Sequence, residues 1–170
     1  MTFKTFQVDC GAVYYDPDTP TNTLTGLDHL EGETVAVLVN GQYVGEEIVS
    51  FGKIRLVYTG NHIIVGIPYD TLIKTLNPDA GAENGTAMGR KIKVTNPVLY
   101  FFETGAGVQY GPDEGRLKDV PDLVERQLST LKVPVSMPGG FDTDGQIVIK
   151  MDKPLPMYLS SISYDVEPSD

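Results

Sequence analysis

The segment Asp142-Thr143-Asp144-Gly145 carries two carboxylates at the alternate spacing that begins a calcium-binding loop. In such loops alternate oxygen ligands converge on the ion, and a bidentate acid further along completes the coordination. After Asp144 no further acid follows until Asp152. Half of the motif supplies too few oxygen ligands, so the sequence favours a turn built on Asp-Gly. Asp142 and Asp144 remain a weak calcium candidate.

The two histidines, His29 and His62, lie far apart in the sequence and do not have the spacing of metal ligands. A zinc site needs three or four converging nitrogen or sulfur donors. Cys10 is the only cysteine, so the chain can form no internal disulfide, and we expect its thiol to be a small core residue. We expect a turn position for His29, a strand end for His62, and neither a metal nor a cofactor.

Other catalytic patterns are missing or incomplete. The chain has no G-x-S-x-G nucleophile elbow, and its glycine-rich stretch at residues 105–111 lacks the lysine and helix of a phosphate-binding loop. The adjacent acids Glu46-Glu47 and Asp113-Glu114 point to opposite faces of a strand or lie in a loop, so neither pair forms an acid–base dyad. The sequence therefore predicts a protein that is not an enzyme.

The composition argues against two classes of partner. The chain carries 23 acidic and 13 basic residues, a net charge of −10, whereas binding to nucleic acid needs clustered Lys and Arg. The one tight basic cluster, Arg90, Lys91 and Lys93, is small enough to be a solvated strand start. No apolar run approaches the roughly 18 residues of a membrane helix, and the N-terminus lacks the apolar core of a signal peptide. We expect a soluble protein that binds neither nucleic acid nor membrane.

The elements that position these side chains are short apolar runs separated by turn dipeptides, a pattern typical of β-strands joined by tight turns. Thr34–Val39 has the composition of a buried strand, and Asn40-Gly41 accepts the positive φ of a type I′ turn, so Tyr43–Ser50 should return antiparallel. Lys53–Tyr58 and His62–Ile67 are the next strands. Because strands joined by short links tend to pair, we expect all four to form one contiguous antiparallel sheet. The charged turn at residues 28–33 is expected to set the register of the strand that follows it.

The later part of the chain continues the strand pattern. Lys91–Thr104 is the longest strand candidate, and it should bend at Pro97 or lie at a sheet edge, because proline cannot donate to a ladder. Most of the nine tyrosines and six phenylalanines fall in strand runs, so we expect them in the core. The whole pattern indicates an all-β, antiparallel β-sandwich or barrel-like domain with long loops and at most short helical turns.

No linker divides the chain, so residues 1–170 are predicted to form a single β-rich domain. Within it we expect an N-terminal arm over residues 1–22, a main sheet over 23–76, a loop over 77–88 rich in Gly, Asn and Asp, and a second part over 89–170.

Two stretches of the sequence resemble a recurrent pattern in tail proteins of tailed bacteriophages. The first is GLDHLEGETVAVLVNG at residues 26–41, followed by GKIRL at 52–56 and IVGIPY at 64–69. The second is GFDTDG at 140–145, followed by DKPLP at 152–156 and a final apolar strand. Order and spacing agree over residues 24–166. The resemblance is to the C-terminal part of tail stabilisation or nozzle proteins, including the tail tubular proteins of short-tailed phages.

The resemblance implies a structural virion protein of the phage tail, a nozzle or tail-tube component that assembles by protein–protein contacts. It further implies a homo-oligomeric ring with other tail proteins as partners, located in the virion tail after synthesis in the host cytoplasm. The alternative is a β-sandwich module that binds a glycan or receptor on the host surface, with aromatic side chains stacked on sugars.

Overall fold

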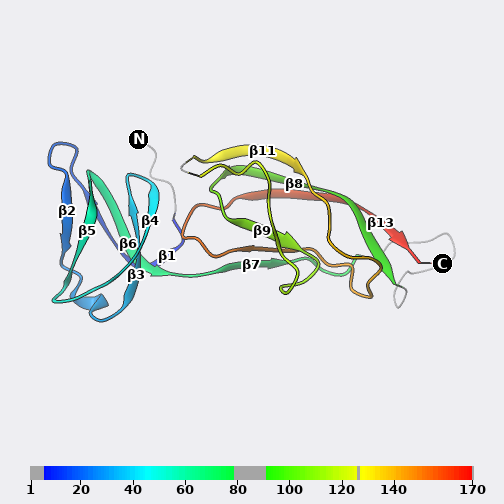
Figure 1. The fold of residues 1–170 in the computed structure, drawn as a ribbon, viewed down its shortest axis with the longest axis horizontal. Coiled ribbons are helices and arrows are strands. Elements are labelled where there is room, and N and C mark those ends of the chain that lie inside the picture. Colours follow the sequence, from blue (N-terminus) through cyan, green and yellow to red (C-terminus); the bar gives the residue numbers. More distant parts are fainter. Residues whose placement is uncertain (1–5, 79–90, 126, 170) are drawn as a thin grey trace. The chain divides into compact units, whose positions relative to one another are not determined.

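The computed structural model describes residues 6–78, 91–125 and 127–169, and these residues form an all-β fold (Figure 1). The strands pair antiparallel throughout the described sheets, which confirms the predicted fold class. The helical content of these ranges is one short 3-10 turn, η1 (Asp28–Leu30). Within the described part of the chain, no helix has the length and apolar character needed to span a bilayer.

The chain divides into two compact units, where the sequence led us to expect one domain. The first unit contains residues 1–70 and 153–156, and the second contains 71–152 and 157–170. The boundary falls inside the predicted main sheet of residues 23–76, because β7 (Thr71–Lys74) pairs with β12 (Val148–Met151) of the second unit. The predicted loop 77–88 lies outside the described residues, except for its first two.

The first unit contains two antiparallel sheets that share one buried core. The larger sheet has the order β1-β6-β3-β4, and the smaller pairs β2 with β5. Leu24 and Ile54 from the smaller sheet and Val37 and Val65 from the larger sheet belong to the same buried cluster. The strands are β1 (Val8–Tyr15), β2 (Thr21–Thr25), β3 (Thr34–Val39), β4 (Gln42–Ile48), β5 (Lys53–Gly60) and β6 (His62–Pro68).

The β3–β4 hairpin confirms the prediction made from Asn40-Gly41. Both residues have positive φ, 52° for Asn40 and 82° for Gly41, and Val39 pairs with Gln42 across the turn. This two-residue connection with two positive φ values is the combination that a type I′ turn requires. The local dipeptide therefore determines this hairpin.

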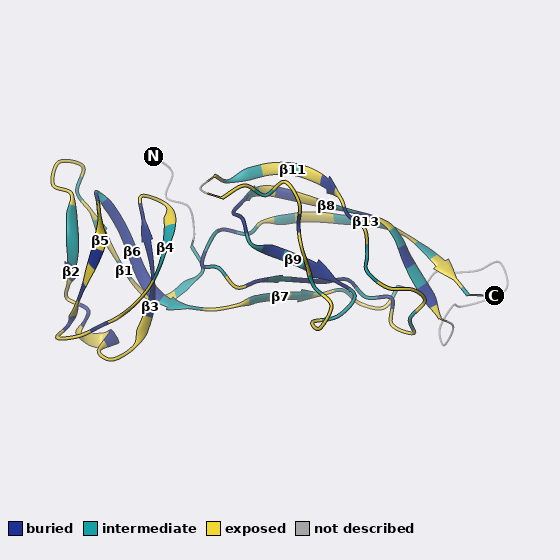
Figure 2. Cartoon of the chain, in the orientation of Figure 1, coloured by how far each residue is buried: buried dark blue, intermediate teal, exposed yellow. Residues whose placement is uncertain are grey.

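The prediction of one sheet over the four consecutive strands is wrong for β5. This strand pairs with β2, whereas β6 lies between β1 and β3 in the other sheet. The residues of β6 from His62 to Gly66 are all buried, which suits a strand with a neighbour on each side (Figure 2). The turn after Gly60 therefore carries the chain from one sheet to the other. Val8–Tyr15, which falls within the expected N-terminal arm, forms β1 and pairs along β6.

The second unit also contains two antiparallel sheets, with the orders β10-β9-β12-β7 and β11-β8-β13. Figure 1 shows β11, β8 and β13 running side by side as one layer of this unit. The strands not yet introduced are β8 (Ile92–Thr104), β9 (Val108–Gly111), β10 (Lys118–Asp119), β11 (Ser129–Pro134) and β13 (Leu159–Pro168).

Strand β8 passes Pro97 in the centre of its sheet by means of a bulge. Asn96 has a φ of 50°, and the register with β13 shifts between Ser163, which pairs with Val98, and Asp165, which pairs with Thr95. Two residues of β8 therefore face one residue of β13, and the ladder avoids the missing N–H of the proline. The predicted irregularity at Pro97 is confirmed, but the strand is central in its sheet.

Candidate functional site

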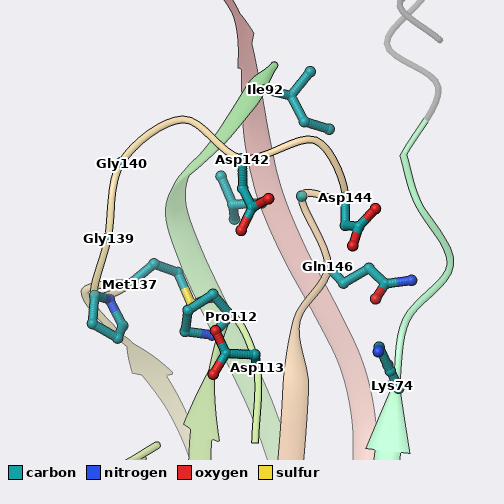
Figure 3. A pocket seen from close by; sticks show the side chains of 13 residues that line it. Lys74, Ile92, Pro112, Asp113, Met137, Gly139, Gly140, Asp142, Asp144 and Gln146 are labelled. Atoms are coloured by element: carbon teal, nitrogen blue, oxygen red, sulfur yellow. The ribbon is translucent and has the colours of Figure 1, made fainter. Parts of the chain in front are cut away.

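A pocket of about 220 Å³ lies in the second unit, beside the loop that contains the calcium candidate (Figure 3). It is lined by Lys74 at the end of β7, Ile92 and Val94 at the start of β8, Pro112 and Asp113 after β9, and most of the loop over residues 137–146. The fold thus brings Asp113 to the same pocket as Asp142 and Asp144, which the sequence places about thirty residues further along.

Arg116 neutralises part of this acidic group. Its Nε donates a hydrogen bond to Oδ2 of Asp113 at 2.7 Å, and its Nη2 lies 2.6 Å from the same oxygen. Nη2 is also 3.6 Å from Oδ2 of Asp142. The hydrogen bond from Arg116, together with the Gly115 N–H, holds the pKa of Asp113 below its ordinary value, and Asp113 raises the pKa of Arg116. The carboxylates of Asp113 and Asp142 therefore both lie close to the guanidinium group of Arg116.

The Asp142–Gly145 loop is attached to the start of β8. The N–H of Ile92 donates to the carbonyl of Asp142 at 2.7 Å, and the N–H of Asp142 donates to the carbonyl of Ile92 at 2.8 Å. Gly145 has a φ of 54°, and a Cβ atom there would lie 2.2 Å from Cδ1 of Ile92, so the close approach requires glycine. The loop is a turn, as predicted, but it bridges to β8 instead of forming a hairpin of its own.

The two acids of this loop do not converge on one point. In Figure 3 the side chain of Asp144 points toward Gln146, while Asp142 lies nearer to Asp113. Oδ1 of Asp142 accepts the Thr143 N–H at 2.6 Å. Across the ranges that the structure describes, no three His, Cys, Asp or Glu side chains are grouped so that they could hold a metal ion. The geometry of this loop therefore supports its role as a turn.

The histidines and the cysteine lie in the first unit and serve separate local contacts. His29 is part of η1, and its Nε2 lies 3.0 Å from the carbonyl oxygen of Cys10. His62 begins β6, as predicted, and its ring meets the Tyr15 ring edge-on at a centroid distance of 5.7 Å. The prediction of a buried thiol is wrong: Cys10 is exposed, with a φ of 51° at a register shift in β1.

A carboxylate clamp holds the turn between β4 and β5. Oε1 of Glu31 accepts the Phe51 N–H at 2.9 Å, and Oε2 accepts the Gly52 N–H at 2.7 Å. Both hydrogen bonds lower the pKa of Glu31, and the bond from Gly52 has the larger effect. The Leu27 N–H also donates to the carbonyl of Gly52 at 2.9 Å. Glu31, in the charged corner of residues 28–33, thus fixes a turn about twenty residues later.

The clamped turn presents Phe51 to solvent. This side chain is 87% exposed, and its backbone has a φ of 54°, in the left-handed region that a bulky residue rarely adopts. Such a conformation costs on the order of 1–3 kcal/mol and persists only where the surroundings fix it. The sequence analysis did not predict that Phe51 is exposed. A signal was present, because an aromatic residue directly before the glycine of a tight turn has no strand partner on which to pack.

The expectation that most aromatic residues pack in the core is wrong. Strand alternation buries every second side chain, so aromatic residues in neighbouring positions of one strand face opposite sides. On β8, Phe101 is 1% exposed, whereas Tyr100 and Phe102 beside it are 43% and 52% exposed. Among the residues that the structure describes, the exposed aromatic side chains are Tyr15, Phe51, Tyr58, Tyr69, Tyr100, Phe102, Phe141 and Tyr158.

Comparison of the sequence with protein-family models and with curated proteins gives no match.

Proposed function

We propose that this chain is a structural component of a phage tail, of the stabilisation or nozzle type, that assembles by contacts with copies of itself and with other tail proteins. The observation that carries the proposal is the pair of sequence resemblances, at residues 26–69 and 140–166, which occur in the same order and at the same spacing as in that family. We propose no catalytic activity for it.

The roles of the residues in the first stretch support this proposal. Leu27 and Leu30 are fully buried in the core of the first unit, and Glu31 clamps the Phe51–Gly52 turn. Side chains of this stretch that could be mistaken for a chemical site are therefore engaged in building and fixing the fold. A stretch used in this way is expected of a structural module, whose function depends on shape and surface.

The exposed apolar side chains also support an assembly role. Tyr100 and Phe102 on β8 and Tyr158 directly before β13 are exposed on paired segments of one sheet, and a contiguous exposed apolar patch is typical of surfaces that become covered by a partner. A tail component is in contact with neighbours on several sides. Its surface is expected to carry more than one such group.

The test is localisation in the particle. Phage particles encoded by the genome that carries this gene would be purified, analysed by mass spectrometry, and labelled with gold-conjugated antibodies raised against the chain. The proposal expects peptides of the chain in purified particles and gold at the tail. Peptides found only in the soluble fraction of lysed cells, with particles free of the chain, would overturn it.

A further inference from the structure

The turn that carries Phe51 has the properties of an anchor for a protein partner. Ile48 and Phe51 are both exposed at the ends of a four-residue segment that includes the buried Val49, and we call these two side chains the Phe51 knob. The Glu31 clamp fixes the turn before any partner arrives. An apolar side chain on a fixed backbone costs less conformational entropy on binding than one on a mobile loop, which favours it as an interface anchor.

The charge around the knob restricts its partner. Asp28, which packs against Gly52, and Glu33, whose carbonyl accepts the Val49 N–H, are both exposed acids beside the turn. Together with Glu31 they outnumber Lys53 and Arg55, the exposed bases of the neighbouring strand β5. Two knobs facing each other would bring like charges together, which opposes a symmetric contact. The knob therefore fits an apolar surface that carries a cation.

The second unit offers such a surface on its β11-β8-β13 sheet. Tyr100 and Phe102 are exposed on β8, and the Phe102 N–H donates to the carbonyl of Tyr158, which is itself 42% exposed. Lys132, paired with Tyr100 in the sheet, places its Nζ 5.3 Å from the centre of the Tyr100 ring. We call these four residues the aromatic patch. Glu103, which follows Phe102 at a bulge of β8, is a half-buried acid next to this patch.

We propose that the Phe51 knob of one copy of this chain docks on the aromatic patch of a second copy. The contact joins apolar to apolar surface and the acids around the knob to Lys132. Because knob and patch are different surfaces, each added copy leaves one of each free, and such a head-to-tail contact closes into a ring when the rotation between copies allows it. The inference rests on the proposed assembly role and names its partner and its two surfaces.

The first test is the concentration dependence of sedimentation velocity. Wild-type chain is expected to associate. Phe51→Asn, which removes the ring but tolerates the left-handed backbone, is expected to weaken association about thirtyfold, the effect of losing an interface anchor. Lys132→Glu is expected to weaken it about tenfold. The matched controls are Val57→Asn, at an equally exposed apolar position of β5, and Lys118→Glu, on the other sheet of the second unit; both should associate like wild type.

The second test is a mixing experiment that separates a head-to-tail contact from a symmetric one. Phe51→Asn keeps the patch and loses the knob, whereas Phe102→Ser keeps the knob and loses part of the patch. At a concentration at which wild-type chain associates and each variant alone is monomeric, an equimolar mixture of the two variants should form dimers, because one intact knob and one intact patch remain. Thermal unfolding of each variant checks that it is folded, as expected for two exposed positions.

Several outcomes would overturn the inference: wild-type chain that remains monomeric at every concentration, Phe51→Asn that associates like wild type, or a mixture that forms no dimers. Monomeric wild-type chain that is retained on a polysaccharide matrix, with retention lost in Phe102→Ser, would overturn it in favour of a glycan. If the chain is found in the phage tail but fails these association tests, the inference is wrong and the proposed function still stands. Chain that passes them but is absent from particles would remove the proposed function.

Discussion

Oε2 of Glu31 accepts the backbone N–H of Gly52 at 2.7 Å, across 21 residues of sequence. With the second bond, from the Phe51 N–H, one carboxylate satisfies two successive backbone donors of a tight turn. The turn is thereby fixed by a side chain from a different part of the first unit, and the left-handed conformation of Phe51 depends on that contact.

Replacing Glu31 tests the clamp. Glu31→Gln keeps one acceptor oxygen and should lower the thermal midpoint slightly, while Glu31→Ala leaves both N–H groups without this acceptor and should lower it by a few degrees. Glu33→Ala, at an exposed neighbouring acid whose side chain makes no such bond to the turn, is the matched control. Equal midpoints for Glu31→Ala and Glu33→Ala would show that the clamp does not stabilise the fold.

The clamp also predicts a pH dependence. Hydrogen bonds from Gly52 and Phe51 lower the pKa of Glu31 from its ordinary value of 4.5. A carboxylate whose pKa is lower in the folded state stabilises the fold fully above 4.5 and loses that contribution as the pH falls through the folded-state pKa. The stability difference between wild type and Glu31→Gln, from urea unfolding, should shrink as the pH falls below 4.5. A difference that is constant or grows in acid contradicts this reasoning.

Gly145→Ala should destabilise the second unit by about 1–3 kcal/mol, because it adds a Cβ atom against Ile92 and strains a residue with positive φ. Gly140→Ala lies in the same loop, has no heavy atom within 4 Å of the added Cβ, and should leave the free energy of unfolding nearly unchanged. Urea unfolding of both variants provides the comparison. Similar values for the two would mean that the loop moves away from β8 without cost.

Phe101 and Phe102 provide a second matched pair, on opposite faces of β8. Phe101→Ala should lower the free energy of unfolding by about 3–5 kcal/mol, since it empties a fully buried site. Phe102→Ala should change it by less than about 1 kcal/mol, since that ring is half-exposed. Chemical unfolding measured by circular dichroism distinguishes them, and a reversed order would contradict the assignment of faces.

Calcium should have no effect on the stability of the chain. The carboxylates of Asp142 and Asp144 lie apart, and Arg116 approaches Asp142 to 3.6 Å. Thermal midpoints measured with excess chelator and after adding calcium should therefore agree. A rise with calcium that is lost in Asp144→Asn would establish a site at this loop.

Local sequence chemistry predicted the parts of this fold that depend on neighbouring residues. Asn40-Gly41 determined a hairpin, and Pro97 indicated an irregular strand, because in both cases backbone geometry limits the choice. The partner of β5 could not be predicted in this way. Turn residues show that the chain reverses but not which sheet the next strand joins, and β6 joined the sheet in which it could be buried between two neighbours.

The candidate sites were likewise predictable only where they depend on neighbouring residues. The Asp142–Gly145 turn was predictable from its own residues, whereas its attachment to Ile92 brings together positions about fifty residues apart. The exposed aromatic rings escaped prediction because residue type indicates an average tendency to be buried. The bulges and strand alternation of β8 decide which ring is actually covered.

Residues 153–156 belong to the first unit although they follow most of the second unit in the sequence, and the Gln7 N–H donates to the carbonyl of Pro154 at 3.4 Å. During synthesis the ribosome produces β1 to β6 first, but this unit gains its last segment only after residue 156 has left the exit tunnel. The two units are therefore linked in biogenesis. A nascent chain that stalls in the second unit leaves the first one unfinished.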